Sequence, residues 1–187
     1  MKRTRISLIL LMMFIIIPAC TIFVGGPSYP DTPIAISTEA VASLQDEIKA
    51  AVSTGAINGE VTIIMSEVQL TSYLASKLTT DLTPIFTDPQ VYLRDDQMLI
   101  YGKTQQGYFA ANIGIVLTVG PDENGNPELH LTSADFGPFP LPDGLNKAIT
   151  AIIEEAYTGA LGPVATGFRI SAITIADGLM MINGKIR

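Results

Sequence analysis

The sequence predicts an α+β domain in which a strongly curved antiparallel sheet faces amphipathic helices. Apolar residues recur with helical spacing in three segments and with alternating spacing in several others. The longest alternating run spans residues 107–119. Fully extended it would measure roughly 43 Å at about 3.3 Å per residue, so a compact domain can hold it only in a twisted or curled sheet.

Residues 1–20 form a leader of secretory type. Three basic residues, Lys2, Arg3 and Arg5, precede an apolar run over residues 6–17 in which only Ser7 is polar. The segment ends in Ile-Pro-Ala-Cys, which resembles a bacterial lipobox, although a proline stands where a small residue is usual. Cys20 is the only cysteine, so it is the expected lipid anchor of a lipoprotein.

An uncleaved signal anchor over residues 6–24 is the alternative, because an apolar stretch of this length can span a bilayer. Either anchor predicts an extracytoplasmic body tethered to the cell membrane. Residues 21–36 are rich in Gly and Pro and predict a flexible tether. A single domain is expected over residues 37–187.

Two helices and a strand open the domain. Helical spacing of apolar residues predicts a helix from Thr38 to about Gly55. A β-rich run over residues 60–65 follows. Ser66 and Gln69 then match a capping box, in which each side chain bonds the other's amide, and a helix is expected from there to about residue 80.

Strands dominate the rest of the chain. Asp95-Asp96 and Asp177-Gly178 are two-residue turn signals, and they predict hairpins over residues 91–103 and 168–186. Between the hairpins we expect, in order, the run 107–119, a turn at 121–127, a strand at 128–133, a proline-rich crossover at 136–142 and a helix at 143–159.

The two hairpins resemble each other. Residues 91–103 align without gaps on residues 173–185, at an offset of 82, with identical Asp, Met, Ile, Gly and Lys at five aligned positions. Shared turn chemistry could explain this similarity. Because a helix precedes both hairpins at a similar distance, we favour a helix-plus-hairpin unit that is used twice.

Catalytic and metal-binding patterns are missing from the sequence. The single histidine, His130, lies between two leucines of a predicted strand, without a nucleophile motif elsewhere. No zinc pattern, P-loop or dinucleotide fingerprint occurs, so we expect no enzyme, no metal and no cofactor. The leader holds three of the 11 basic residues, which leaves eight basic against 18 acidic residues, a net charge of −10, in the body. Nucleic acid is therefore excluded as a partner.

Apolar surface is the feature that remains. Two segments, residues 98–101 and 179–182, are apolar on both strand faces, so we expect these strands to be covered on both sides or to line a cavity. Helices facing a curled sheet could leave an apolar groove. A well-packed core without a ligand explains the same pattern.

The order of elements, the Phe139-Pro-Leu-Pro142 segment before a helix, and the Ile-Thr-Ile-Ala-Asp-Gly-Leu segment at residues 173–179 resemble the LmeA-like phospholipid-binding family and the YpmS-type lipoproteins. The resemblance covers residues 61–186. It implies a TULIP-like fold, in which a highly curved antiparallel sheet wraps one or two long amphipathic helices and holds lipid tails without catalytic residues. The body is acidic, whereas attraction to anionic head groups would need a basic surface.

The resemblance implies a membrane-tethered protein that binds phospholipid or other acyl chains in an apolar groove. An envelope protein-protein interaction module with a dry core and an unidentified protein partner is the alternative. The candidate groove residues are apolar side chains from the predicted helices and strands: Leu70, Leu74, Ile100, Phe109, Ile113, Ile115, Ile149, Ile152 and Ile153.

Overall fold

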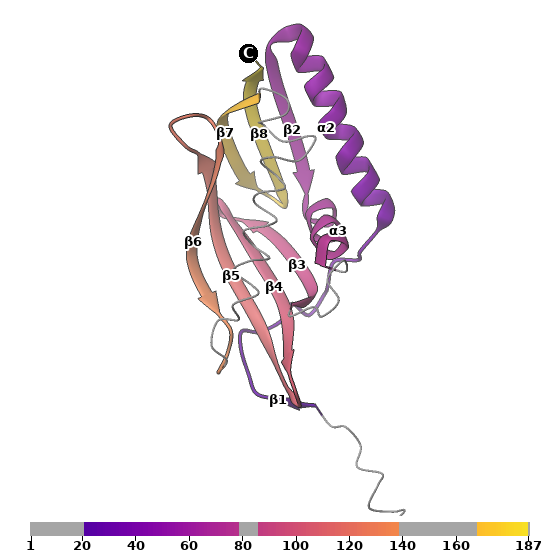
Figure 1. The fold of residues 1–187 in the computed structure, drawn as a ribbon, viewed down its shortest axis with the longest axis vertical. Helices are drawn as coiled ribbons and strands as arrows, with labels where there is room; N and C mark the ends of the chain where they lie inside the picture. The colour runs from indigo at the N-terminus through magenta and orange to yellow at the C-terminus, as the bar shows by residue number, and fades with distance from the viewer. Residues whose placement is uncertain (1–20, 79–85, 139–167, 187) are drawn as a thin grey trace, which may run out of the picture.

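The computed structural model describes residues 21–78, 86–138 and 168–186. They form an α+β fold with two curved sheets arranged one after the other along the long axis of the molecule (Figure 1). The elements are β1 (Ile22–Phe23), α2 (Thr38–Asn58), β2 (Glu60–Ser66), α3 (Glu67–Leu78), β3 (Thr87–Arg94), β4 (Gln97–Gln106), β5 (Phe109–Pro121), β6 (Pro127–Asp135), β7 (Phe168–Ala176) and β8 (Leu179–Ile186).

The larger sheet has the order β1-β5-β4-β3, and β6 also pairs with β5. The smaller sheet has the order β2-β8-β7. The α+β class and the curved sheet are confirmed, but the expectation of one antiparallel sheet is wrong in two respects. The strands divide into two sheets, and β1 pairs with β5 in parallel, with Ile22 opposite Phe109.

Local sequence signals place the two helices. Ser37 caps α2 by accepting the amide of Ala40 at 3.2 Å. The helix continues past Gly55, where the sequence predicted its end, to Asn58. A Cβ at Gly55 would lie 2.1 Å from a methyl group of Val61, so a glycine inside the helix lets β2 pack closely. Gly59, at φ 77°, ends the helix in the left-handed conformation.

The capping box that starts α3 is confirmed. The Ser66 amide donates to Oε1 of Gln69 at 2.9 Å, and the Gln69 amide donates to Oγ of Ser66 at 3.3 Å. Nε2 of Gln69 also donates to Oε1 of Glu47 at 3.0 Å, so the same side chain joins α3 to α2.

The two hairpins adopt equivalent registers. Val91 pairs with Ile100, and the corresponding residues of the second hairpin, Ile173 and Ile182, also pair. Both turns have positive φ at their two central residues, with values of 51° and 58° at Asp95 and Asp96 and of 51° and 79° at Asp177 and Gly178. The repeat of the hairpin is therefore structural. The helix expected before the second hairpin, at 143–159, lies outside the described residues.

Residues 24–36, which we call the strap, lie within the segment expected to be a tether and form hydrogen bonds with the larger sheet. The Asn112 amide donates to the carbonyl of Gly25 at 3.0 Å, and Nδ2 of Asn112 donates to the carbonyl of Pro27 at 3.0 Å. Further along, the Tyr92 hydroxyl donates to the carbonyl of Thr32 at 3.0 Å. These bonds hold the strap across the outer face of the larger sheet.

Among the described residues, two apolar clusters form the core. The first joins α2, the smaller sheet and β3, with Leu93 fully buried. The second lies on the inner face of the larger sheet, which is the face opposite the strap. It is built from Phe86, Ile113, Ile115, Leu117 and Phe136.

Candidate functional site

The structure brings four of the predicted groove residues together. Ile113 and Ile115 of β5 are 0% and 2% exposed within the second cluster, and Leu74 of α3 and Ile100 of β4 pack against it. Ile100 lies directly opposite Ile115 in the strand pairing, so both side chains share the inner face of the sheet. Alternation along the strand and the helical stripe of α3 had placed these four residues among the groove candidates.

Leu74, Met98 and Ile100 pack against both core clusters and remain partly exposed. We call these three residues the seam. They lie where α3 meets the inner face of the larger sheet. An elongated apolar ligand could bury part of its surface against such a partly exposed seam between two buried clusters.

The other predicted residues have different positions. Leu70 packs only against the first cluster, as a part of the core. Phe109 lies at the start of β5, far along the strand from the seam, and is 46% exposed. The anchor Cys20 and the helix residues Ile149, Ile152 and Ile153 lie outside the described residues.

Sequence reasoning missed Met98 and Leu129 as members of this surface. Met98 pairs with Leu117, and Leu129 of β6 pairs with Val119, so both follow from strand register once β5 is placed. The inner face also reaches an exposed edge, because Leu131 lies opposite the buried Leu117 and is itself 61% exposed.

A polar group interrupts the inner face between the seam and the start of β5. Thr104 is 1% exposed, and its hydroxyl has no hydrogen-bond partner among the described residues. It shares the even positions of β4 with Ile100 and Gly102. A Cβ at Gly102 would lie 2.3 Å from the Phe86 ring, so the glycine makes room for that ring beside Thr104. A buried hydroxyl without a partner costs about 1–3 kcal/mol.

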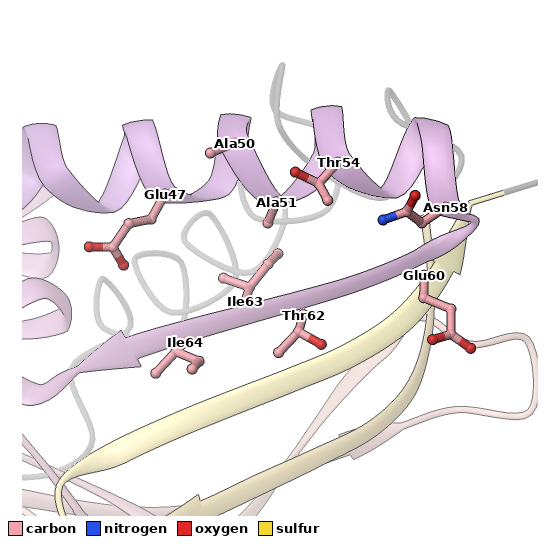
Figure 2. A pocket seen from close by; sticks show the side chains of 9 residues that line it. All are labelled: Glu47, Ala50, Ala51, Thr54, Asn58, Glu60, Thr62, Ile63 and Ile64. Carbon is pink, nitrogen blue, oxygen red and sulfur yellow. The ribbon is translucent and has the colours of Figure 1, made fainter.

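A pocket of about 570 Å³ opens between α2 and β2 (Figure 2). Ala51 of α2 and Ile63 of β2 point toward each other across it, and Glu47 and Glu60 lie near its two ends. Its volume falls within the range typical of small-molecule sites, about 300–1,000 Å³. None of the six described groove candidates lines it, so it is separate from the seam.

The apolar strands are covered to different degrees. The strap packs on the outer face of the larger sheet, where a Cβ at Gly114 would lie 2.9 Å from the Pro27 ring. Tyr29 of the strap bonds the Asp88 carbonyl at 2.8 Å, and burial, followed by the Asp88 carboxylate, raises the pKa of its phenol. On β8, however, Leu179 and Met181 stay 46% and 39% exposed.

The titratable groups of the described residues are spread over the surface. His130 is an exposed residue of β6, with Nε2 3.4 Å from Oε2 of Glu128. Among residues 21–78, 86–138 and 168–186, no group of three or more His, Cys, Asp or Glu side chains could hold a metal ion. Within the same ranges, neither helix is long and apolar enough to cross a membrane.

Comparison with known proteins gives one similar structure. No family model matches the chain, and no curated protein matches it. A solved structure described as the crystal structure of lipopolysaccharide binding protein is 11% identical, with a TM-score of 0.27. The match covers 68% of this chain and 50% of that one, so the chain spans about half the length of the solved structure.

Proposed function

We propose that this protein is tethered outside the cytoplasmic membrane by its N-terminal segment and binds the acyl chains of a phospholipid or similar lipid without catalysing a reaction. The observation that carries the proposal is the apolar inner face of the larger sheet. Ile100, Ile113 and Ile115 share this face, Leu74 of α3 packs against it, and the seam connects it to the first cluster.

An acyl chain suits such a surface because it needs apolar contact and no hydrogen bonds. Each buried methylene contributes about 0.8 kcal/mol, so roughly ten methylenes against the inner face would contribute about 8 kcal/mol before the cost of ordering the chain. The net charge of −10 in the body disfavours anionic head groups at long range. Tail binding does not depend on that charge, so we propose that the protein recognises the acyl chain and makes no specific contacts with the head group.

We further propose a TULIP-like fold and a relationship to the LmeA-like and YpmS-type proteins. The sequence resemblance at residues 173–179 supports it, and the curved sheets with their two helices are compatible with it. A solved structure of the protein with a lipid lying along the inner face would test this relationship directly.

Native mass spectrometry of the chain from Thr21 to Arg187 tests lipid binding. This chain keeps β1 and the strap, which pack on the larger sheet. We expect satellite masses of bound phospholipid, their loss after delipidation and their return when phospholipid is added. A lipid-free mass throughout, without uptake of added lipid, would contradict the proposal.

A matched pair of variants separates the seam from the general core. Leu74→Asn places an amide in the seam, whereas Ile48→Asn places the same amide against the first cluster only. Both variants should lose stability to a similar extent. Lipid uptake should fall only in Leu74→Asn, and an equal loss in both variants would argue against the seam as the contact surface.

The tether has its own test. Replacement Cys20→Ser should release the body or leave an unprocessed precursor if Cys20 is lipidated. An unchanged mass and unchanged membrane retention would favour the uncleaved anchor over residues 6–24.

An interaction module is the second candidate function, and the smaller sheet favours it. Ile64 and Met181 are opposite each other on its outer face and are 44% and 39% exposed, with Leu179 beside them at 46%. Contiguous exposed apolar side chains often mark protein contacts. A chain that stays lipid-free in the mass measurement and loses affinity for an envelope protein after Met181→Lys would support this function.

A further inference from the structure

Four apolar side chains gather at the end of the larger sheet, where β1 lies beside the β4–β5 hairpin. Ile22 and Phe23 of β1 are 54% and 60% exposed, and Tyr108 and Phe109 of the hairpin are 69% and 46% exposed. We call these four residues the tip. The tip stands at one end of the long axis of the molecule (Figure 1).

Backbone hydrogen bonds fix β1, which follows the leader in the sequence, to the β4–β5 hairpin. The Ile22 amide donates to the carbonyl of Tyr108 at 2.7 Å, and the Val24 amide donates to the carbonyl of Ala110 at 2.9 Å. The apolar run of the leader, residues 6–17, ends only a few positions before Ile22. Because β1 is fixed to β5, little free chain separates the anchor from the tip.

The tip is an uncharged part of an acidic body. Residues 21–30 and 104–121 contain no Asp, Glu, Lys, Arg or His. The nearest charged side chain on β4, Lys103, is neutralised by Asp88, with Nζ 2.8 Å from Oδ2. The tip can therefore approach a lipid surface without the repulsion or desolvation that the rest of the body would suffer.

We propose that the tip inserts into the interface of the bilayer that holds the leader, so that the body stands on the membrane on this end. Tyr and other aromatic side chains favour the boundary between head groups and acyl chains, where the ring is apolar and the hydroxyl stays hydrated. The inference rests on the membrane tether of the proposed function.

Insertion at this end would place membrane lipid beside the strand that carries the inner face. Phe109, Ile113 and Ile115 occupy odd positions of β5 and therefore lie on one face of the strand. Ile22 pairs with Phe109 and shares that face. On β5 an apolar stripe thus runs from the tip toward the seam, past the buried Thr104 of β4, which lies opposite Ala111. The exposed position of Phe109 assigns it to the tip end of this stripe.

Tryptophan fluorescence tests the insertion, because the chain contains no tryptophan. The full chain with Tyr108→Trp is reconstituted into phosphatidylcholine vesicles, with or without brominated acyl chains. A ring about 5–10 Å deep in the interface should lose roughly half of its emission to the bromines. Phe23→Trp provides a second reporter in case Tyr108→Trp perturbs the hairpin turn.

The matched control is Ile57→Trp. Ile57 is 85% exposed near the end of α2, which lies at the opposite end of the long axis (Figure 1). Bromines should leave its emission unchanged. Equal quenching at both ends, or no quenching of Tyr108→Trp and Phe23→Trp, would overturn the tip contact.

The outcome for the tip is independent of acyl-chain binding. If the tip reporters are not quenched while the chain from Thr21 still takes up lipid, only the orientation is wrong. Quenched tip reporters in a chain that takes up no lipid would keep the orientation and reject the proposed function. Failure of the full chain to associate with vesicles would reject the tether and the tip together.

Discussion

The amide of Asp96 donates a hydrogen bond to the carbonyl of Ile175 at 3.2 Å, and the amide of Gly178 returns one to the carbonyl of Leu93, also at 3.2 Å. In the alignment of the two hairpins, Asp96 corresponds to Gly178 and Leu93 to Ile175. The two bonds are therefore equivalent, with the donor from one hairpin and the acceptor from the other in each case. The two copies of the hairpin therefore meet turn to turn through equivalent atoms. This contact joins the larger sheet to the smaller one.

The two turns predict opposite effects of matched substitutions. Asp96 has φ 58°, which is unfavourable for a residue with a Cβ, so Asp96→Gly should raise the free energy of unfolding by about 0.5–1 kcal/mol. Gly178 has φ 79°, and Gly178→Ala should lower it by about 1–2 kcal/mol. Urea unfolding followed by circular dichroism measures both, and a destabilised Asp96→Gly would contradict the prediction.

Glu67 should stabilise the same junction from α3. Its carboxylate accepts the Leu93 amide at 2.8 Å and pairs with Arg94, while its own amide donates to the carbonyl of Gly178 at 3.2 Å. The carboxylate is mostly buried, with 16% of the side chain exposed, so Glu67→Gln should cost about 1 kcal/mol. The exposed pair of Asp88 and Lys103 is the control.

In that control, Asp88→Asn should change the unfolding free energy by less than about 0.5 kcal/mol, because both side chains are about half exposed. Thermal unfolding of the two variants at low and high salt compares them. Equal losses of unfolding free energy in the two variants would show that Glu67, despite its place between the two turns, stabilises the protein no more than an exposed ion pair does.

Thr104→Val should stabilise the protein. The substitution replaces a hydroxyl that has no partner among the described residues by a methyl group of nearly the same size, in a site that is 1% exposed. We expect a gain of about 1 kcal/mol in the unfolding free energy. Thr104→Ser, which keeps the hydroxyl and removes a methyl group, should destabilise. A loss of stability in Thr104→Val would mean that the hydroxyl is bonded in solution.

Local chemistry explains which elements were predictable. The hairpin at 168–186 has its predicted boundaries, because the Asp-Gly turn fixes the register within a few residues. The capping box of Ser66 and Gln69 is equally local. Strand parity likewise predicted the shared face of Ile113 and Ile115.

Contacts between distant residues were not predictable in the same way. The position of the strap depends on hydrogen bonds from Asn112, which lies far along the chain from Pro27. A Gly- and Pro-rich segment has no periodicity that predicts such a bond. The contact between the two sheets is also long-range, because the reciprocal bonds join turns about 80 residues apart in the chain. Phe109 occupies an odd position of β5, as Ile113 and Ile115 do, yet it lies at the tip, because β5 extends beyond the covered part of the inner face.

Acid should loosen the β5–β6 turn before the hairpins. Asp122 accepts the amides of Asn124 and Asn126 at 2.8 and 2.7 Å and Nδ2 of Asn126 at 2.9 Å. The backbone bond from Asn126, followed by the bond from its side chain, lowers the pKa of this carboxyl. Because the folded pKa is the lower one, the contribution to stability is present above the ordinary pKa and disappears as the pH falls through the lowered value.

The consequence should appear at β7. The carbonyl of Gly125 accepts the Ile170 amide at 2.7 Å, so the turn holds the start of β7 against the larger sheet. Hydrogen exchange at Ile170 should accelerate as the pH falls below the ordinary pKa of an aspartate, once the intrinsic pH dependence is subtracted. Asp122→Asn should abolish this acceleration, because an amide side chain does not titrate. Exchange at Ile182, in the centre of β8, serves as the control and should not show the transition; a parallel change there would indicate global acid unfolding.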